Sequence, residues 1–261
     1  MTSMNYSWMG MFLAALLLII QLLFQFQLFT FAFIILLILL ISVAFLPENN
    51  RVFVWTLVSF SVGLFAFIYI GRIILELPFS HVDTFILTRF LLVLPILFMS
   101  YVIRKFNQRV LLFSKKIEWN ETFVFGGVKK TFRIVIAVLG LILIYLLWKS
   151  RSYLFDNLPK VVLFSLINGV LVELIWRGIL LTRLQLLVGS KLAVLVSSIS
   201  CAIAYYLFGY TFPFCLVFFV LCLFLGTITW KTKSLVPAII LNVLLTLILI
   251  FMNVVPLIVI K

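Results

Sequence analysis

The sequence contains little charge and almost no histidine. Charged residues make up 10% of the 261 residues, Asp and Glu together number 7, and His81 is the single histidine. The three cysteines, Cys201, Cys215 and Cys222, lie inside apolar runs and form no Cys-x-x-Cys spacing. Soluble domains carry ~25% charged residues, and zinc sites and disulfide frameworks need clustered Cys or His. The composition therefore excludes a soluble globular domain, and we expect no metal or other cofactor.

Long apolar runs take the place of the missing charge. Hydrophobic residues make up 66% of the chain, and the mean hydropathy is +1.36. Uncharged runs of ~18 residues or more, which are long enough for membrane-spanning helices, recur along the sequence. The strands of an outer-membrane barrel would instead show alternating segments of ~10 residues. The sequence therefore predicts an all-α polytopic membrane protein.

The number of spans depends on the first apolar run. Residues 7–46 carry no charge and are about twice as long as the ~20 residues that one span needs. Gln21, Gln25 and Gln27 lie near the middle, which favours two spans with a tight turn between them. The remaining spans are expected at 52–77, 84–103, 131–148, 161–182, 192–208, 212–230 and 235–260. The total is nine spans, or eight if the first run is not split. Arg89, near the start of the span 84–103, is expected to reach the interface with its long side chain.

One long polar connection, residues 104–133, divides the chain into N-terminal helices (1–103) and C-terminal helices (134–261). Its basic residues are Arg104, Lys105, Arg109, Lys115, Lys116, Lys129, Lys130 and Arg133. Leucine and phenylalanine residues are interleaved with them, as in segments that lie among lipid headgroups on the cytoplasmic side. The segment then either sets the topology as a solvated loop or binds lipid or a partner.

The Lys and Arg residues that give the net charge of +13 lie mainly at the predicted helix ends and in short loops. This distribution is typical of the positive-inside rule and of contact with anionic headgroups, so we expect a lipid bilayer as partner and no nucleic acid. With nine spans, the connections on the side of segment 104–133 hold most of the Lys and Arg, which places that segment and the N-terminus in the cytoplasm. An unsplit first run would put the N-terminus outside.

A carboxylate and a guanidinium lie deep in an apolar run of the C-terminal half. Glu173 and Arg177 have the i,i+4 spacing that places both on one face of a helix, where they can pair. An unpaired charge in hydrocarbon costs ~3 kcal/mol on insertion scales, so such a pair suggests a functional site. Two further helices carry polar stripes, with Ser198, Cys201 and Tyr205 on one and Asn242 and Thr246 on the other. We expect the three stripes to face one another around a polar cavity.

The sequence around Glu173 resembles a known family motif. Residues 172–180 resemble the Glu-Glu-x-x-x-Arg motif of the CPBP family (CAAX proteases and bacteriocin-processing enzymes, also called Abi), with Val172 in place of the first glutamate. The second motif, Phe-x-x-x-His, resembles the stretch from Cys201 to Tyr205. The third, with His-x-x-x-Asn, resembles the stretch from Asn242 to Thr246. The resemblance covers about residues 160–250.

The resemblance implies a CPBP-like helical core and, for the family, an intramembrane peptidase in which two glutamates and two histidines activate water. Only Glu173 of these four remains, and Arg177 beside it would keep it ionised and weakly basic. Tyr205 and Asn242 can donate hydrogen bonds but do not shuttle protons near neutral pH. Our first hypothesis is therefore a pseudoenzyme.

Three functions follow from this comparison. The first is a non-catalytic scaffold or regulator of a cell-envelope enzyme or sensor kinase in a bacterial plasma membrane. The second is an active peptidase that uses Glu173 in an altered site, and the third is a lipid or small-molecule carrier. For the scaffold, we expect a partner's helix to pack on the aromatic N-terminal spans, at positions such as Phe60, Phe65 and Phe67.

Overall fold

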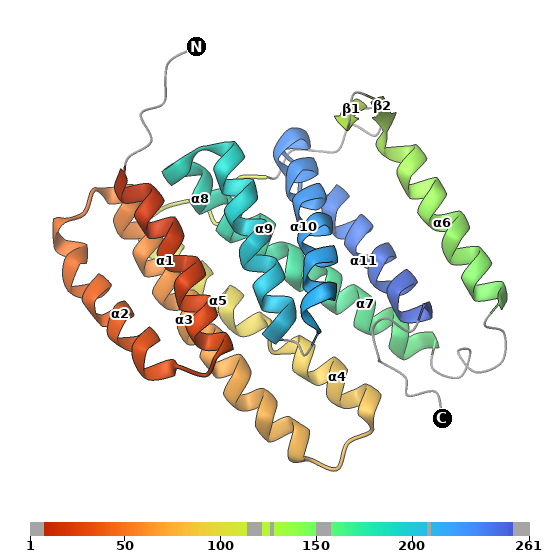
Figure 1. Ribbon diagram of the computed structural model, residues 1–261, viewed down its shortest axis with the longest axis horizontal. Helices are drawn as coiled ribbons and strands as arrows, with labels where there is room; N and C mark the ends of the chain where they lie inside the picture. The colour runs from red at the N-terminus through yellow and green to blue at the C-terminus, as the bar shows by residue number, and fades with distance from the viewer. Residues whose placement is uncertain (1–7, 114–121, 126–127, 150–157, 208–209, 253–261) are drawn as a thin grey trace.

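The computed structural model describes residues 8–113, 122–125, 128–149, 158–207 and 210–252. Its N-terminal helices are α1 (Trp8–Gln25), α2 (Phe29–Ser42) with the short η1 (Val43–Phe45), α3 (Glu48–Glu76), α4 (His81–Phe90) and α5 (Val93–Lys105). A two-stranded hairpin, β1 (Thr122–Phe125) and β2 (Val128–Thr131), precedes α6 (Phe132–Lys149). The C-terminal part consists of α7 (Leu158–Glu173), η2 (Leu174–Leu180), α8 (Leu181–Val188), α9 (Ser190–Leu207), α10 (Phe212–Thr232) and α11 (Val236–Phe251). Figure 1 shows the helices as a bundle of roughly side-by-side rods.

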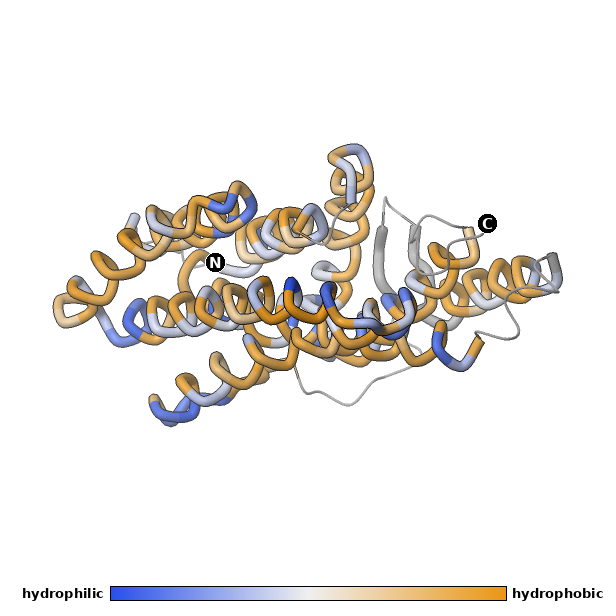
Figure 2. The backbone as a smooth tube through the Cα atoms, turned by 90° about the horizontal axis from the view of Figure 1, so that it is seen from below, coloured by the Kyte–Doolittle hydropathy of each residue, from blue (hydrophilic) through white to orange (hydrophobic). Residues whose placement is uncertain are grey.

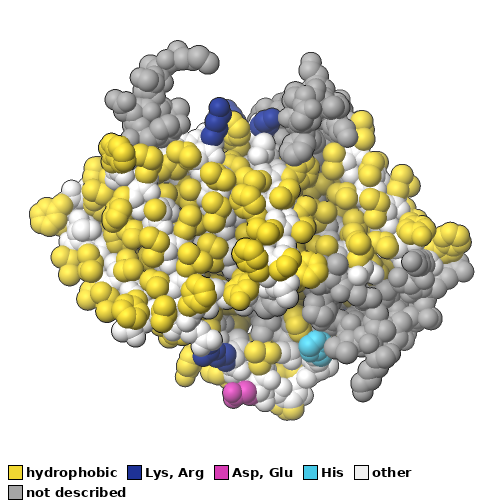
Figure 3. Space-filling view, in the orientation of Figure 1, with side chains coloured by type: hydrophobic (Ala, Val, Ile, Leu, Met, Phe, Trp, Pro, Cys, Tyr) yellow, Lys and Arg dark blue, Asp and Glu magenta, His cyan; other side chains and the backbone are white. Residues whose placement is uncertain are grey.

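The predicted polytopic all-α fold is confirmed. Within the described residues, 6 helices are long and apolar enough to cross a membrane, and three shorter apolar helices accompany them. Hydrophobic side chains cover the middle of the face in Figure 3, whereas the charged side chains visible there lie at its two edges. Figure 2 shows the same pattern along the backbone, with the hydrophilic stretches mostly near helix ends. This arrangement is that of a protein surrounded by lipid.

The first apolar run is split, as its glutamines indicated. α1 ends at Gln25 and α2 begins at Phe29. Gln27 between them has a φ of 58°, a left-handed conformation that reverses the chain. The second apolar stretch of the run, Phe29–Phe45, is among the shorter apolar helices.

The span that contains Arg89 differs from its prediction. It runs over His81–Lys105 and is interrupted at Leu91 and Leu92, between α4 and α5. Arg89 does not extend to the surface, since its residue exposure is only 5%. Its guanidinium lies 5.9 Å from the centre of the Phe164 ring, and its side chain is hydrogen-bonded to Tyr210. Groups from two distant segments therefore hold this cation inside the bundle, and the predicted reach to the interface was wrong.

The hydrophobic core joins the N-terminal helices to the C-terminal ones. The main cluster includes Leu17, Phe53 and Phe60 from the first half together with Trp176 and Leu184 from the second. Phe60 of α3 meets the Trp176 ring edge-on, with the ring centres 6.3 Å apart. We call Leu158–Val188, the helical segment that contains Glu173 and Arg177, the motif helix. The apolar side chains behind it therefore come from residues that lie far away in the sequence.

The positions predicted for partner contact need correction for the same reason. Phe60 and Phe67 are 1% and 8% exposed, so they lie in the core and cannot meet another protein's helix. Phe65 is half-buried and packs against Phe29 and Phe33. Aromatic content alone did not distinguish the core-facing from the lipid-facing side of α3.

The first described stretch of the basic segment, residues 104–113, is attached to the bundle at two points. Arg183 of α8 donates hydrogen bonds to the Gln108 side chain and the Arg109 carbonyl. Further along, the backbone N–H of Leu235 donates to the Phe113 carbonyl, with N and O 3.3 Å apart. Arg104, Lys105 and Arg109 are exposed, Lys129 and Lys130 lie in β2, and Arg133 lies in the first turn of α6. Lys115 and Lys116 lie outside the described residues.

Candidate functional site

The motif helix widens into a π-helical turn where the charges lie. α7 ends at Glu173 and continues without a break into η2, a seven-residue π-helix, and then α8. The backbone N–H of Leu181 reaches the Trp176 carbonyl, five residues back, as π-helical bonding requires. Single π-turns within α-helices often mark functional sites. The sequence predicted a regular helix here and missed this widening.

The predicted ion pair is present and fully buried. Arg177 Nη1 lies 3.1 Å from Glu173 Oε1, and the two side chains are 1% and 0% exposed. Asn242 of α11 donates a hydrogen bond from Nδ2 to the same Glu173 oxygen at 2.7 Å. The other oxygen, Oε2, is buried and has no hydrogen-bond partner among the described residues. The carboxylate is thus fixed on one side by a cation and an amide.

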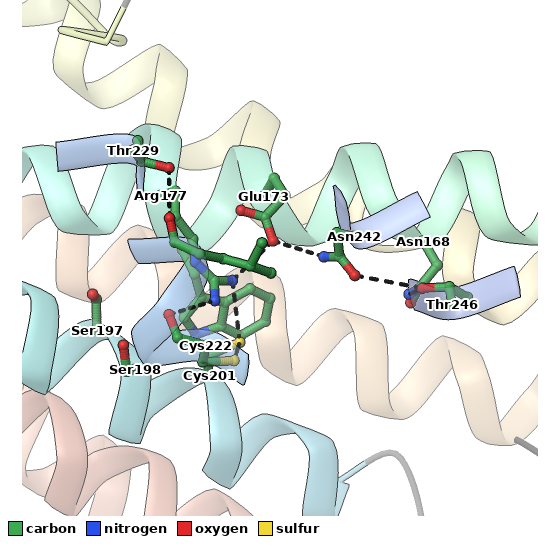
Figure 4. A network of polar contacts seen from close by, with 12 residues as sticks. Asn168, Glu173, Arg177, Ser197, Ser198, Cys201, Cys222, Thr229, Asn242 and Thr246 are labelled. Atoms are coloured by element: carbon green, nitrogen blue, oxygen red, sulfur yellow. Dashed lines mark hydrogen bonds and ion pairs between the residues drawn. The ribbon is translucent and has the colours of Figure 1, made fainter. Parts of the chain in front are cut away.

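Arg177 also bonds to the next two helices. Its Nη1 donates to Cys201 Sγ of α9 at 3.4 Å, and its Nη2 donates to the Cys222 carbonyl of α10 at 3.1 Å. The two thiols are in contact as well, with the sulfur atoms 2.8 Å apart. The guanidinium therefore links α7, α9 and α10 around one buried charge (Figure 4).

A second set of hydrogen bonds continues along α11. Thr246 Oγ1 lies 3.4 Å from Asn242 Oδ1 and 3.4 Å from Asn168 Nδ2. In Figure 4 these residues extend the line of polar contacts from Glu173 past Asn242 to Thr246 and Asn168. We refer to Asn168, Glu173, Arg177, Asn242 and Thr246 together as the polar centre. The structure thus brings together the stripes of α7 and α11 that the sequence predicted to face one another.

Tyr205, which stands at a histidine position of the family motif, is placed differently. It is buried on α9, and its ring stacks on Phe218 of α10 with the centres 3.9 Å apart. Ser198, the other polar member of the predicted α9 stripe, bonds to the Val194 carbonyl of its own helix. Of that stripe, Cys201 bonds directly to the polar centre through Arg177.

The cavity at the polar centre is very small. Its volume is about 20 Å³, and its walls include Asn168, Arg177, Tyr205, Asn242 and Thr246. One water needs ~10–15 Å³ of such space, so the cavity holds about one water molecule and no peptide. Glu173 is not among the wall residues, whereas its two partners Asn242 and Arg177 are.

The chemistry open to this arrangement is narrow. A general base must reach the proton that it removes and be basic near neutral pH, whereas Glu173 is held by a cation and an amide. Across the described residues there is no group of three or more Cys, His, Asp or Glu that could hold a metal ion. The polar centre is therefore suited to fixing helices against one another, and it contains one carboxylate with one unbonded oxygen.

Comparison with known proteins places the motif helix in a family. Residues 154–248 match the family model described as type II CAAX prenyl endopeptidase Rce1-like. Over these residues the chain is similar to the CAAX protease family. No curated protein and no solved structure matched the chain.

The CAAX-protease match agrees with the predicted range of about 160–250 and includes the whole polar centre. It begins after α6, so α1 to α6 lie outside it although α1, α2, α3 and α5 supply much of the main core cluster. Val172, Tyr205 and Asn242 are the residues that we predicted, from the resemblance alone, to stand at the Glu, His and His positions of the family motifs. Among these, Asn242 contacts Glu173 directly and Val172 lies buried in the apolar core.

Sequence reasoning missed the contribution of α10. Cys222 enters the site through its backbone carbonyl, which leaves no trace in the sequence. Trp176 was also unassigned, yet its Nε1 donates to Ser200 Oγ at 3.2 Å and fixes η2 against α9. The wide spread of polar residues on α9 was the one signal that could have suggested this second attachment.

Proposed function

We propose that this protein is a non-catalytic member of the CAAX protease family that acts as a membrane scaffold or regulator. The observation that carries the proposal is the cavity of about 20 Å³ at the polar centre, whose walls do not include the Glu173 carboxylate. A prenylated or leader peptide needs a far larger space, since ligand pockets usually measure ~300–1,000 Å³.

The electrostatics of the polar centre support the same proposal. Burying a carboxylate requires compensation, and Arg177 and Asn242 provide it at 3.1 Å and 2.7 Å. These contacts use one carboxylate oxygen and fix the Glu173 side chain against η2 and α11. Under this proposal, Glu173 and Arg177 set the register of α7 against α9, α10 and α11.

A membrane protein is the proposed partner, for example a cell-envelope enzyme or a sensor kinase in a bacterial plasma membrane. The 104–133 segment would face the cytoplasm. The surface open to such a partner is on α2, where Phe31 and Leu37 are each 59% exposed and α2 packs mainly on α1. Apolar helices associate in membranes through van der Waals packing, which large side chains such as these can provide.

Photo-crosslinking in native membranes tests where the partner binds. A photoreactive residue at Phe31 or Leu37 should capture one specific protein. The matched control is Leu141 on α6, which is 66% exposed and should capture only scattered products. Specific capture from Tyr205, inside the family core, would contradict the scaffold proposal and indicate a binding pocket.

Complementation tests whether Glu173 has a chemical role. In cells that lack the protein, wild type and Glu173→Gln are expressed at equal levels. Both should correct the defect that the loss of the protein causes to the same extent. Loss of function in Glu173→Gln, with abundance and fold intact, would contradict a non-catalytic role.

A second candidate, an active peptidase with an altered site, has one observation in its favour. Glu173 Oε2 has no hydrogen-bond partner among the described residues, and the adjoining cavity can hold one water. For this function, the helices around the cavity would have to separate to admit a peptide. Cleavage of a membrane-anchored or leader peptide by wild type, and its loss in Glu173→Gln, would support the peptidase function over the scaffold.

A further inference from the structure

A second cavity lies among the N-terminal helices and shares no wall residue with the first. Its volume is about 320 Å³, against about 20 Å³ at the polar centre. It is bounded by the end of α1, the last turns of α3, by α4 and by the end of α9 (Figure 1). This volume falls within the ~300–1,000 Å³ of ligand pockets. We call it the basic cavity, and its polar wall residues are Gln25, Gln27, Arg72, Thr84, Thr88 and Arg89.

The charge of the basic cavity has one sign. Arg72 of α3 and Arg89 of α4 are both wall residues, and none of the described residues that form the walls is Asp or Glu. The acidic residues nearest to them in sequence are Glu76 and Asp83, which are not part of the walls. Asp83 is paired with Lys160, whose Nζ lies 2.7 Å from Oδ1. Two guanidinium groups on an apolar cavity create a positive potential that favours an anion.

The wall groups are arranged for a ligand that also donates hydrogen bonds. Arg89 is held by the Phe164 ring and the Tyr210 hydroxyl, so its position does not depend on a ligand. Gln25 Oε1 is buried and has no hydrogen-bond partner among the described residues. An unsatisfied buried acceptor is costly, and a hydroxyl on the ligand would satisfy it.

The remaining walls and the depth of the cavity indicate a lipid. Phe24, Phe67 and Ile68 supply an apolar surface beside the two arginines. Gln25 is the last residue of α1 and Arg72 lies one turn before the end of α3, so the cavity is at the depth of headgroups. These helix ends are opposite to the end where segment 104–133 is attached.

We infer that the basic cavity binds the phosphate of an anionic phospholipid with a hydroxyl-bearing headgroup, in the leaflet opposite segment 104–133. Arg72 and Arg89 contact the phosphate, Gln25 accepts a hydrogen bond from the headgroup hydroxyl, and the aromatic walls contact the first carbons of the chains. Nothing in this assignment depends on the state of the polar centre.

Native mass spectrometry of the full-length protein, released from neutral detergent, tests the assignment. At a low molar ratio of lipid to protein, phosphatidylglycerol should remain bound to the protein and phosphatidylcholine should not. Arg72→Gln should weaken phosphatidylglycerol retention by about tenfold, since it removes a charge-assisted hydrogen bond. Arg72 is exposed, so this variant should fold. Lys191→Gln, which removes an exposed cation from the first turn of α9, is the matched control and should leave retention unchanged.

A steric variant tests the cavity without changing charge. A Cβ at Gly71, which is a wall residue, would meet nothing within 4 Å, so Gly71→Leu can fill the cavity without a clash. A Cβ at Gly140 of α6 also meets nothing within 4 Å, and Gly140→Leu is therefore the matched control. Gly71→Leu should abolish retention and Gly140→Leu should not.

Three results would overturn the assignment. Wild-type retention by both Arg72→Gln and Gly71→Leu would show that the lipid binds elsewhere. Equal retention of phosphatidylcholine would show that the cavity does not select an anionic headgroup. Displacement of phosphatidylglycerol by millimolar inorganic phosphate would overturn the lipid part and identify free phosphate as the ligand.

Discussion

The polar centre and the basic cavity differ in what surrounds their arginine side chains. At the polar centre, Arg177 has a carboxylate at 3.1 Å and two further acceptors, and the space beside it measures about 20 Å³. In the basic cavity, Arg72 and Arg89 share about 320 Å³ with no carboxylate in the walls. A buried charge that the protein itself neutralises serves to fix helices, whereas a cationic wall beside open space can accept a ligand.

This comparison reverses what the family motif suggests. The polar centre, which lies within the residues that match the CAAX protease family, has the smaller of these two cavities, whereas all but one of the wall residues of the basic cavity lie outside the match. The two are connected through Arg89, because its partners Phe164 and Tyr210 are also wall residues of the small cavity. A displacement of the Arg89 side chain would therefore affect the walls of both cavities.

The largest expected effect is the loss of charge balance at the polar centre. Arg177→Met should lower the free energy of unfolding by ~3–5 kcal/mol, because it leaves Glu173 buried without its cation. The double variant Glu173→Gln/Arg177→Met should recover more than half of that loss, since no buried charge remains. Thermal unfolding of the purified protein in detergent measures both. A double variant that is less stable than Arg177→Met would show that the pair is not the source of the cost.

Two positions on α11 should separate strong from weak contacts within the polar centre. Asn242→Leu conserves volume and removes the 2.7 Å hydrogen bond to Glu173, so we expect a loss of ~1.5–3 kcal/mol. Thr246→Val removes hydrogen bonds of 3.4 Å, which are long, and should cost ~0.5–1 kcal/mol. Chemical denaturation of the two variants gives the difference, and equal losses would contradict this ranking.

A pair of glycines compares the packing of the two regions. A Cβ at Gly169, beside the polar centre, would lie 2.5 Å from Val243 Cγ2, so Gly169→Ala should destabilise by ~1–3 kcal/mol. Gly71→Ala, in the basic cavity, meets open space and should stabilise α3 by ~0.5–1 kcal/mol. Unfolding midpoints in one detergent report both changes. Destabilisation by Gly71→Ala would mean that the basic cavity is closed in solution.

Much of the fold followed from the sequence, because apolar length and glutamine placement are local signals. The split of the first run at Gln27 and the pairing of Glu173 with Arg177 needed only chain spacing. The meeting of Asn242 with Glu173 followed from the rule that polar residues in lipid find one another.

The rest depended on contacts between distant segments, which spacing does not report. Arg89 is buried because Phe164 and Tyr210, far away in the sequence, surround it. The Cys222 carbonyl has no sequence signature, and Phe60 faces Trp176 because of the bundle's packing. The sizes of the two cavities, on which the functional argument depends, could not be read from the sequence at all.

Peptide hydrolysis by the purified protein is the measurement that tests the central claim, that the polar centre is structural. Wild type and Glu173→Gln would be incubated in detergent with a farnesylated CAAX-type peptide and a leader peptide, and products followed by mass spectrometry. We predict no product above the Glu173→Gln baseline for either peptide. Product that rises with the amount of wild-type protein and disappears in a folded Glu173→Gln variant would contradict the account.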